Sequence, residues 1–292
     1  MLFLLSRPGP GNSEWFRLTN RLQGQLSRLT STTIWQRRAV GETLEKKTEL
    51  IELIEIAGKE ILQIKGGCED SQNKSDGSPV TQADIASNCI ITSGLRSLFP
   101  QLPIVSEEGD MESPEKSFFL VDPLDGTKEF IRGLSDFTVN IALIENQRPL
   151  MGIVHLPSTG LTYFGDRTGA WKIKGDDSMC IHVSQRVQSP RIVTSRSHLD
   201  DATKKFIESY RDAEVFQAGS SAKFCLIAEG AADIYPRFGR TMEWDTAAGQ
   251  AVLEAAGGKV VNPTTGQELP YVKPGYENPG FVAVSNSSLL QK

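Results

Sequence analysis

The stretch that decides the fold is FFLVDPLDGTKEF, residues 118–130. Its four leading apolar residues are typical of a buried strand, and they run directly into an aspartate pair, Asp122 and Asp125. Pro123 fixes its own φ angle and keeps the residue before it extended, so the chain turns sharply where the strand ends. Both carboxylates can then point to one side, which predicts a binding site for a positive group at this strand end.

The residues that complete this turn offer further polar groups. The Leu124 carbonyl lies between the two carboxylates, Gly126 allows a close approach to the backbone, and Thr127 supplies a hydroxyl. If a helix begins here, a phosphate group could lie on the amides of the turn. Taken alone, however, an Asp-Pro turn with a later aspartate is also a common surface feature.

Two other stretches place acids at the ends of apolar segments or before a helix. In VSEEGD, residues 105–110, Glu107 and Glu108 follow an apolar run, and in EWDTAAGQ, residues 243–250, Asp245 precedes an expected helix. The glutamates could be solvated acids, and Asp245 could be a simple N-cap. If the three groups converge, they cannot all ionise without a cation, because like charges raise each other's pKa. Ligands that are all oxygen favour Mg2+ over zinc.

The hydrophobic period divides the remaining chain into helices and strands. Helices are expected at 48–67 and 81–99, and Thr81 with Asp84 forms a capping box at the start of the second. Strands, mostly antiparallel, are expected at 102–105, 118–121, 138–144, 150–156, 161–164 and 170–174. After a boundary at 174–180, strands at 191–195, 213–218 and 233–238 alternate with helices at 198–210, 220–232 and 245–258.

This order predicts three parts: a basic extension over 1–41, an α+β domain over 42–178, and an α/β domain over 179–292. The composition, with 39% apolar residues, 23% charged residues and a formal net charge of -5, is that of a globular protein and gives no reason to expect nucleic acid as a partner. Four cysteines without a C-x-x-C pair and three histidines indicate reduced thiols and no zinc site. No apolar run approaches the ~18 residues of a membrane span.

Residues 1–40 contain six arginines and one acid, Glu14. This pattern fits an organelle transit peptide, and it also fits a disordered extension or a start codon placed too early. We expect a cytoplasmic protein, peripheral at the inner membrane if it is bacterial, with organelle targeting as the alternative.

The acidic motifs carry a family resemblance. An acidic pair, then D-P-x-D-G-T, then W-D-x-A-A-G occur in this order over residues 107–249, and the chain thereby resembles the Mg2+-dependent, lithium-sensitive phosphatases of the inositol monophosphatase superfamily. Within it, the chain is most similar to 3'(2'),5'-bisphosphate nucleotidases of the bacterial CysQ type, on the stretches KSDGSPVTQAD, VDPLDGTKEF, TSRSH, GSSAKFCLIAEGAADIYPRFG and WDTAAG. The resemblance covers roughly residues 45–285 and leaves out the basic N-terminal stretch.

The resemblance implies an α/β fold with an α+β first layer, a two-domain αβαβα five-layer sandwich of the inositol monophosphatase / fructose-1,6-bisphosphatase type. It implies about two or three Mg2+ ions, held by Glu107, Asp122, the Leu124 carbonyl, Asp125 and Asp245. Asp76 and Thr127 would position or activate the attacking water. The substrate would be bound by Gly126, Thr127, His198, Ser220, Lys223, Arg237 and Asp245. Asp84 would cap a helix and anchor the loop.

The implied reaction is hydrolysis of the 3'-phosphate of a small nucleotide, adenosine 3',5'-bisphosphate, with 3'-phosphoadenosine 5'-phosphosulfate as a further candidate substrate. An inositol or sugar phosphatase of the same superfamily is the nearest alternative, although TKEF stands here where inositol phosphatases usually continue with TNF. A catalytically silent nucleotide-binding protein is the alternative of another class. The oligomeric state stays open.

Overall fold

The computed structural model describes residues 45–65, 71–73, 79–109, 114, 116–197 and 199–290. The expectations for the basic N-terminal stretch, for Asp76 and for His198 therefore lie outside the described residues. Within the described ranges, none of the helices has the length and apolar character that crossing a bilayer would require.

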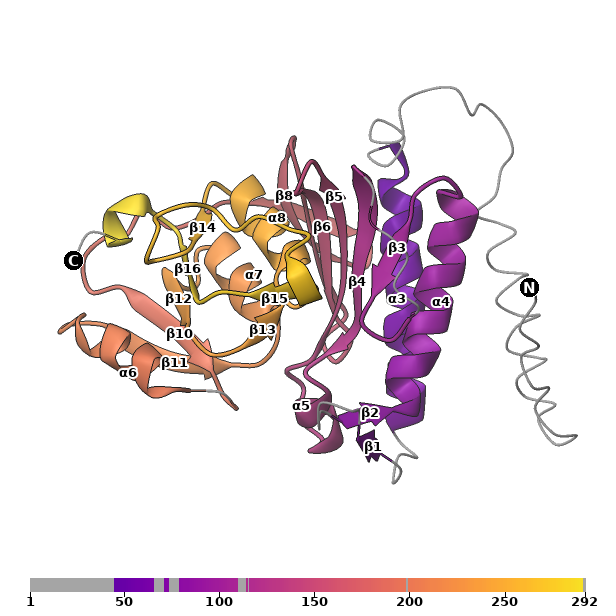
Figure 1. Cartoon of the computed structure of the whole chain (residues 1–292), viewed down its shortest axis with the longest axis horizontal. Helices are drawn as coiled ribbons and strands as arrows, with labels where there is room; N and C mark the ends of the chain where they lie inside the picture. The colour runs from indigo at the N-terminus through magenta and orange to yellow at the C-terminus, as the bar shows by residue number, and fades with distance from the viewer. Residues whose placement is uncertain are drawn as a thin grey trace, which may run out of the picture.

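The described elements stack in five layers (Figure 1). Helices α3 (Lys47–Lys65) and α4 (Gln82–Leu98) cover one face of a seven-stranded sheet. Helices α7 (Ala222–Ala228) and α8 (Ala247–Ala255) lie between this sheet and a five-stranded one, and α6 (Asp201–Glu208) covers the outer face of the smaller sheet. The five-layer αβαβα sandwich expected from the sequence is confirmed.

The two sheets differ in size and strand order. The large sheet has the order β3-β4-β5-β6-β7-β8-β9, in which β3 and β4 run parallel and the later neighbours antiparallel. Its strands are β3 (Ile104–Ser106), β4 (Ser117–Asp125), β5 (Thr138–Glu145), β6 (Arg148–Leu156), β7 (Leu161–Asp166), β8 (Gly169–Lys174) and β9 (Asp177–Ile181). The small sheet has the order β11-β10-β12-β16-β14, with strands β10 (Arg191–Ser195), β11 (Glu214–Ala218), β12 (Ile234–Arg237), β14 (Lys259–Val261) and β16 (Phe281–Val284).

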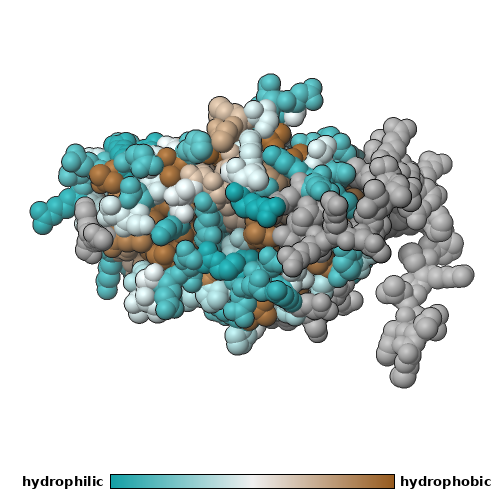
Figure 2. All heavy atoms as spheres, turned by 90° about the horizontal axis from the view of Figure 1, so that it is seen from above, coloured by the Kyte–Doolittle hydropathy of each residue, from teal (hydrophilic) through white to brown (hydrophobic). Residues whose placement is uncertain are grey.

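Short elements complete the described chain: β1 (Ser71–Asn73), β2 (Pro79–Thr81), α5 (Thr127–Ile131), β13 (Thr241–Met242), η1 (Pro274–Tyr276), β15 (Glu277–Asn278) and η2 (Ser287–Leu290). Hydrophilic residues predominate on the face seen in Figure 2, with apolar side chains scattered between them. The apolar residues therefore serve mainly the three cores between the layers.

The apolar run that opens β4 is continuous because both of its faces are buried. Phe119 and Val121 pack with α3 and α4, whereas Phe118 and Leu120 point into the core that contains α7 and α8. Strand residues alternate between the faces of a sheet, so a strand covered on both sides needs no polar positions. This explains why the run ends only at Asp122.

Helix α8 reaches the large sheet through two glycines that pair across neighbouring strands, Gly152 of β6 and Gly165 of β7. A Cβ atom on Gly152 would lie 2.2 Å from the Ala248 carbonyl oxygen, and one on Gly165 would lie 2.5 Å from the Val252 Cα atom. No side chain fits at either position, so the helix backbone lies directly on the sheet. This contact fixes the height of the N-terminus of α8 above the sheet.

Three strands of the two large sheets were not expected from the sequence, and neither were the short strands β1, β2, β13 and β15. Strand β9 falls on the segment 174–180 that the composition marked as a boundary, and it pairs with β8 up to Ile181. It is an edge strand with the sequence DSMCI, in which only Ile181 is buried, so its apolar residues do not alternate between a buried and an exposed face. Strands β14 and β16 are only three and four residues long. The division into two domains stays a proposal, and one apolar core joins both sheets.

We predict that Gly152→Ala lowers the free energy of unfolding by about 3 kcal/mol or more, because the added methyl group meets backbone that cannot move aside. Urea denaturation followed by circular dichroism measures this. Gly160→Ala is the control: its Cβ meets open space, and its φ of 65° limits the cost to about 1–2 kcal/mol of left-handed strain. Equal costs for the two variants would contradict the packing described above.

Candidate active site

The acids at the carboxyl ends of β3 and β4 meet because these two strands run parallel, so these ends share one edge of the sheet. Glu107 follows β3 directly and its N–H donates to the Val121 carbonyl at 3.2 Å, one residue before Asp122. Asn88 of α4 holds the same turn, since its amide donates to the Glu108 carbonyl at 3.1 Å. The third acid, Asp245, comes from the residues that precede α8.

Three carboxylates converge at this edge. One ligand atom each of Glu107, Asp122 and Asp245 lies within 4.8 Å of the others. Asp122 is buried, and the other two are half-buried. In the described part of the chain, this is the group of acidic, His and Cys side chains whose geometry could hold a metal ion. Glu108 and Asp125 are not members of it.

Asp125 lies nearby and is held by a residue that the sequence analysis missed. Asp125 Oδ2 accepts hydrogen bonds from the Ser221 N–H at 2.6 Å and from Ser221 Oγ at 3.0 Å. Ser221 Oγ also lies 2.7 Å from the Asp245 carbonyl oxygen and accepts from the Asn140 amide at 2.9 Å. One serine therefore ties β4, β5 and the start of α8 together. The available signals were a polar Asn140 in an apolar strand and the serine pair before α7.

The turn after Asp125 is built on a left-handed glycine. Gly126 has a φ of 94° and precedes α5, which begins at Thr127. Thr127 Oγ1 can donate to Asp84 Oδ1 at 3.0 Å or to the Leu124 carbonyl at 3.2 Å. Asp84 also accepts from the Thr81 N–H at 2.8 Å and completes the capping box of α4, so its expected capping role is confirmed.

Basic groups line the same cleft as the acids, and the cleft has a volume of about 350 Å³. Lys223 and Arg237, from α7 and β12, are 3% and 7% exposed, and both line the cleft. Ser220 lines it as well, with a φ of 47° and a buried Oγ that has no hydrogen-bond partner within the described residues. Of the expected site residues, the lining also includes Glu107, Asp125, Gly126, Thr127 and Asp245. It further includes Glu129, Tyr235, Arg240 and Met242, which the sequence analysis did not single out.

The charges of the site perturb one another. Burial raises the pKa of Asp245 well above its ordinary value, and the charges of Asp125 and Glu107 raise it further. Burial also raises the pKa of Asp125, although Lys223 and the Ser221 hydrogen bonds oppose this. Burial lowers the pKa of Lys223 to about 8, with Asp125 opposing and Arg237 adding to the shift.

This donor set fits a hard divalent cation. All three groups of the cluster are carboxylates, which suits Mg2+ and is poor for zinc. A divalent charge would relieve the repulsion that raises the pKa of Asp245.

We predict that Mg2+ raises the melting temperature of the protein and does not do so for Asp245→Asn, because the variant loses a ligand. In EDTA, where no metal is bound, we expect Asp245→Asn to have a higher melting temperature than the unchanged protein. Since the folded-state pKa of Asp245 is raised, its ionisation costs stability as pH rises through that pKa. At pH 8 the metal-free variant should therefore melt several degrees higher than the metal-free unchanged protein. A stability difference of about 1 kcal/mol corresponds to a shift of about 2–4 °C in melting temperature.

Differential scanning fluorimetry measures both effects. The exposed acid Asp201 gives the control, since Asp201→Asn should respond to Mg2+ as the unchanged protein does. A Mg2+ response that survives in Asp245→Asn would remove Asp245 from the metal site.

Comparison with known proteins identifies the family of this site. The model of the inositol monophosphatase family matches residues 28–292. The 3'(2'),5'-bisphosphate nucleotidase CysQ of Salmonella typhimurium is 42% identical over 240 residues, which cover 80% of this chain and 97% of that protein. The protein of the same name from Buchnera aphidicola is 44% identical over 218 residues, covering 72% of this chain and 82% of the relative.

Solved structures agree with the sequence matches. The crystal structure of CysQ from Bacteroides thetaiotaomicron has a TM-score of 0.70 and 36% identity, covering 82% of this chain and 97% of that one. A Thermotoga maritima inositol monophosphatase has a TM-score of 0.71 and 25% identity, covering 82% and 93%. The chain belongs to the inositol monophosphatase family.

Proposed function

We propose that this protein is a 3'(2'),5'-bisphosphate nucleotidase that removes the 3'-phosphate of adenosine 3',5'-bisphosphate, giving AMP and phosphate. The proposal draws support from the relatives that carry this name at 42% and 44% identity. The observation that carries it is a single cleft lined both by acids and by two buried cations, Lys223 and Arg237. Such a cleft offers acids to a metal-bound phosphate and cations to a second phosphate.

Glu107, Asp122 and Asp245 would hold Mg2+, with Asp125 and the Leu124 carbonyl as further ligands of about two or three ions. The close approach of the first three groups supports this assignment. Bound Mg2+ would lower the pKa of water and stabilise the charge that develops on the phosphate oxygens.

Thr127 and Asp76 would position the attacking water. The hydroxyl proton of Thr127 is directed to Asp84 Oδ1 or to the Leu124 carbonyl, so the group has lone pairs to offer a water molecule. Asp84 would then act through Thr127 by fixing the direction of its hydroxyl. Asp76 lies outside the described residues, and its role rests on the family motif.

Lys223, Arg237 and Ser220 would bind the phosphate that does not react. The buried Ser220 Oγ has no partner within the described residues, which leaves its hydroxyl available to a phosphate oxygen. Gly126 would let the substrate approach the backbone, and His198, outside the described residues, would contact the nucleotide. Binding the remote phosphate would hold the reacting one in line for attack.

The two buried cations also argue against the nearest alternative. An inositol or sugar monophosphate lacks the second phosphate that Lys223 and Arg237 would bind, so it would forgo the charge-assisted contacts that these two side chains offer. A silent binding protein would have to hold the acidic cluster together with no catalytic use for it. We therefore prefer the nucleotidase, with 3'-phosphoadenosine 5'-phosphosulfate as a second substrate to be tested.

We expect the purified protein to release phosphate from adenosine 3',5'-bisphosphate in the presence of Mg2+, to stop in EDTA and to be inhibited by lithium. The value of kcat/KM for inositol 1-phosphate should be lower by about 100-fold or more, since this substrate has no second phosphate for Lys223 and Arg237 to bind. A colorimetric phosphate assay with both substrates measures this. Preference for inositol 1-phosphate would reverse the assignment, and no turnover of either would leave the silent binder.

Arg237→Ala should reduce kcat/KM for adenosine 3',5'-bisphosphate by about 30–100-fold, the effect of losing about 2–3 kcal/mol from a buried charge pair. Hydrolysis of p-nitrophenyl phosphate, which lacks a second phosphate, should change by less than about threefold. The exposed Arg211 provides the control variant, Arg211→Ala, which should affect neither substrate. An equal loss on both substrates would exclude Arg237 from recognition of the second phosphate.

A further inference from the structure

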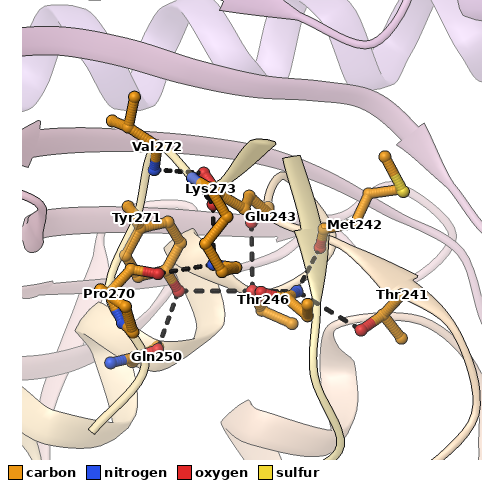
Figure 3. Close-up of polar contacts among 10 residues, drawn as sticks. Thr241, Met242, Glu243, Thr246, Gln250, Pro270, Tyr271, Val272 and Lys273 are labelled. Atoms are coloured by element: carbon orange, nitrogen blue, oxygen red, sulfur yellow. Dashed lines mark hydrogen bonds and ion pairs between the residues drawn. The ribbon is translucent and has the colours of Figure 1, made fainter. Parts of the chain in front are cut away.

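A buried polar network surrounds Glu243, which precedes Asp245 by two residues (Figure 3). Glu243 is fully buried, and its two carboxylate oxygens accept hydrogen bonds from the N–H groups of Val272 and Lys273, each at 2.8 Å. The Lys273 ammonium lies 2.7 Å from Glu243 Oε1. One carboxylate thus joins the segment of Asp245 to a loop that lies thirty residues further along the chain.

That loop has a backbone that requires support. Val272 has a φ of 69° and Tyr276 a φ of 57°, and the left-handed region is unfavourable for a β-branched residue such as valine. Such conformations persist only where the surroundings hold them. Glu243 holds both positions, because its carboxylate accepts from Val272 and its own N–H donates to the Tyr276 carbonyl at 2.8 Å.

The same network fixes the turn that carries Asp245. The Met242 N–H donates to Asp245 Oδ2 at 2.8 Å, and Thr246 Oγ1 donates to the Glu243 carbonyl at 3.1 Å. The Tyr271 hydroxyl lies 3.3 Å from Thr246 Oγ1 and donates to Gln250 of α8 at 2.8 Å. The turn that contains Asp245 is therefore joined to the loop through Glu243 and Thr246 and continues directly into α8.

We propose that Glu243 is a positioning residue that sets the place of the Asp245 carboxylate and so tunes metal affinity. The inference rests on the proposed function, in which Asp245 is a metal ligand. Groups that orient a ligand from behind typically change metal affinity by about 10–100-fold when they are altered. The competing interpretation is a buried ion pair that serves stability alone, and the two interpretations predict different results.

The test uses the full chain and Glu243→Gln, which keeps the size of the side chain and removes its charge. Mn2+ is the probe, because it accepts the same oxygen ligands as Mg2+ and its free concentration can be followed by EPR. We expect the Kd for Mn2+ to rise about 10–100-fold. The Mg2+ concentration for half-maximal activity should rise in parallel, whereas KM for the bisphosphate at saturating Mg2+ should stay unchanged.

The matched control is Asp233→Asn. Asp233 is also fully buried, and it accepts three hydrogen bonds of 2.8–2.9 Å from the backbone and side chain of Arg191. It precedes β12, whereas the cleft residue Arg237 ends that strand. The variant Asp233→Asn should have a lower melting temperature and an unchanged Kd for Mn2+.

The outcomes separate the proposal from the function on which it rests. If the unchanged protein binds no Mn2+, the metal assignment of the proposed function fails. If it binds Mn2+ and folded Glu243→Gln binds equally well, Glu243 serves stability alone and the positioning role is wrong. If Glu243→Gln does not fold, the variant Lys273→Gln provides the test. The Lys273 side chain is 17% exposed, and a glutamine in its place can still donate to the Glu243 carboxylate. A smaller rise in Kd supports the proposal, and an unchanged Kd overturns it.

Discussion

The repulsion among Glu107, Asp122, Asp125 and Asp245 is the constraint on which the rest of the structure depends. Burial raises the pKa of Asp245, and the charges of Asp125 and Glu107 raise it further, so these carboxylates stay close together only where the chain holds each of them in place. The fold meets this constraint with fixed donors. Ser221 holds Asp125, the Met242 N–H holds Asp245, and the Leu124 N–H donates to Asp122 Oδ1 at 3.0 Å. A preorganised site of this kind is ready for a divalent cation.

The layers of the sandwich then decide which acids can meet. Parallel pairing of β3 and β4 brings Glu107 beside Asp122, an effect of the sheet alone. Asp245 joins them only because α8 lies directly on the sheet at Gly152 and Gly165. Bulkier residues at these glycines would lift the helix and move its N-terminus away from the strand ends. The backbone contact of α8 with the sheet therefore determines whether Asp245 reaches the acids at the strand ends.

Much of this could be predicted from the sequence, since local signals agree with the fold. The apolar runs of β4 to β8, the stripe of α3 and the capping box of α4 predicted the first layers, and the acidic motifs predicted the members of the cluster. The sequence analysis missed two features whose local sequence gives no sign of their role. β9 is an exposed edge strand without an alternating apolar pattern, and Ser221 resembles any serine before a helix. Neither residue pattern contains information on the distant partners that give these segments their roles.

The sequence by itself determined the layered α/β fold, the family and the types of ligand atoms, because periodicity and motif spacing are properties of the chain. Only the tertiary structure decided that Asp125 stands outside the compact group of Glu107, Asp122 and Asp245 and is held by Ser221 instead. It alone also joined Glu243 to the strained loop at Val272. The physical reason is range: hydrogen bonds and charge repulsion act over a few Å in space, and residues far apart in sequence reach that distance only after the layers have packed.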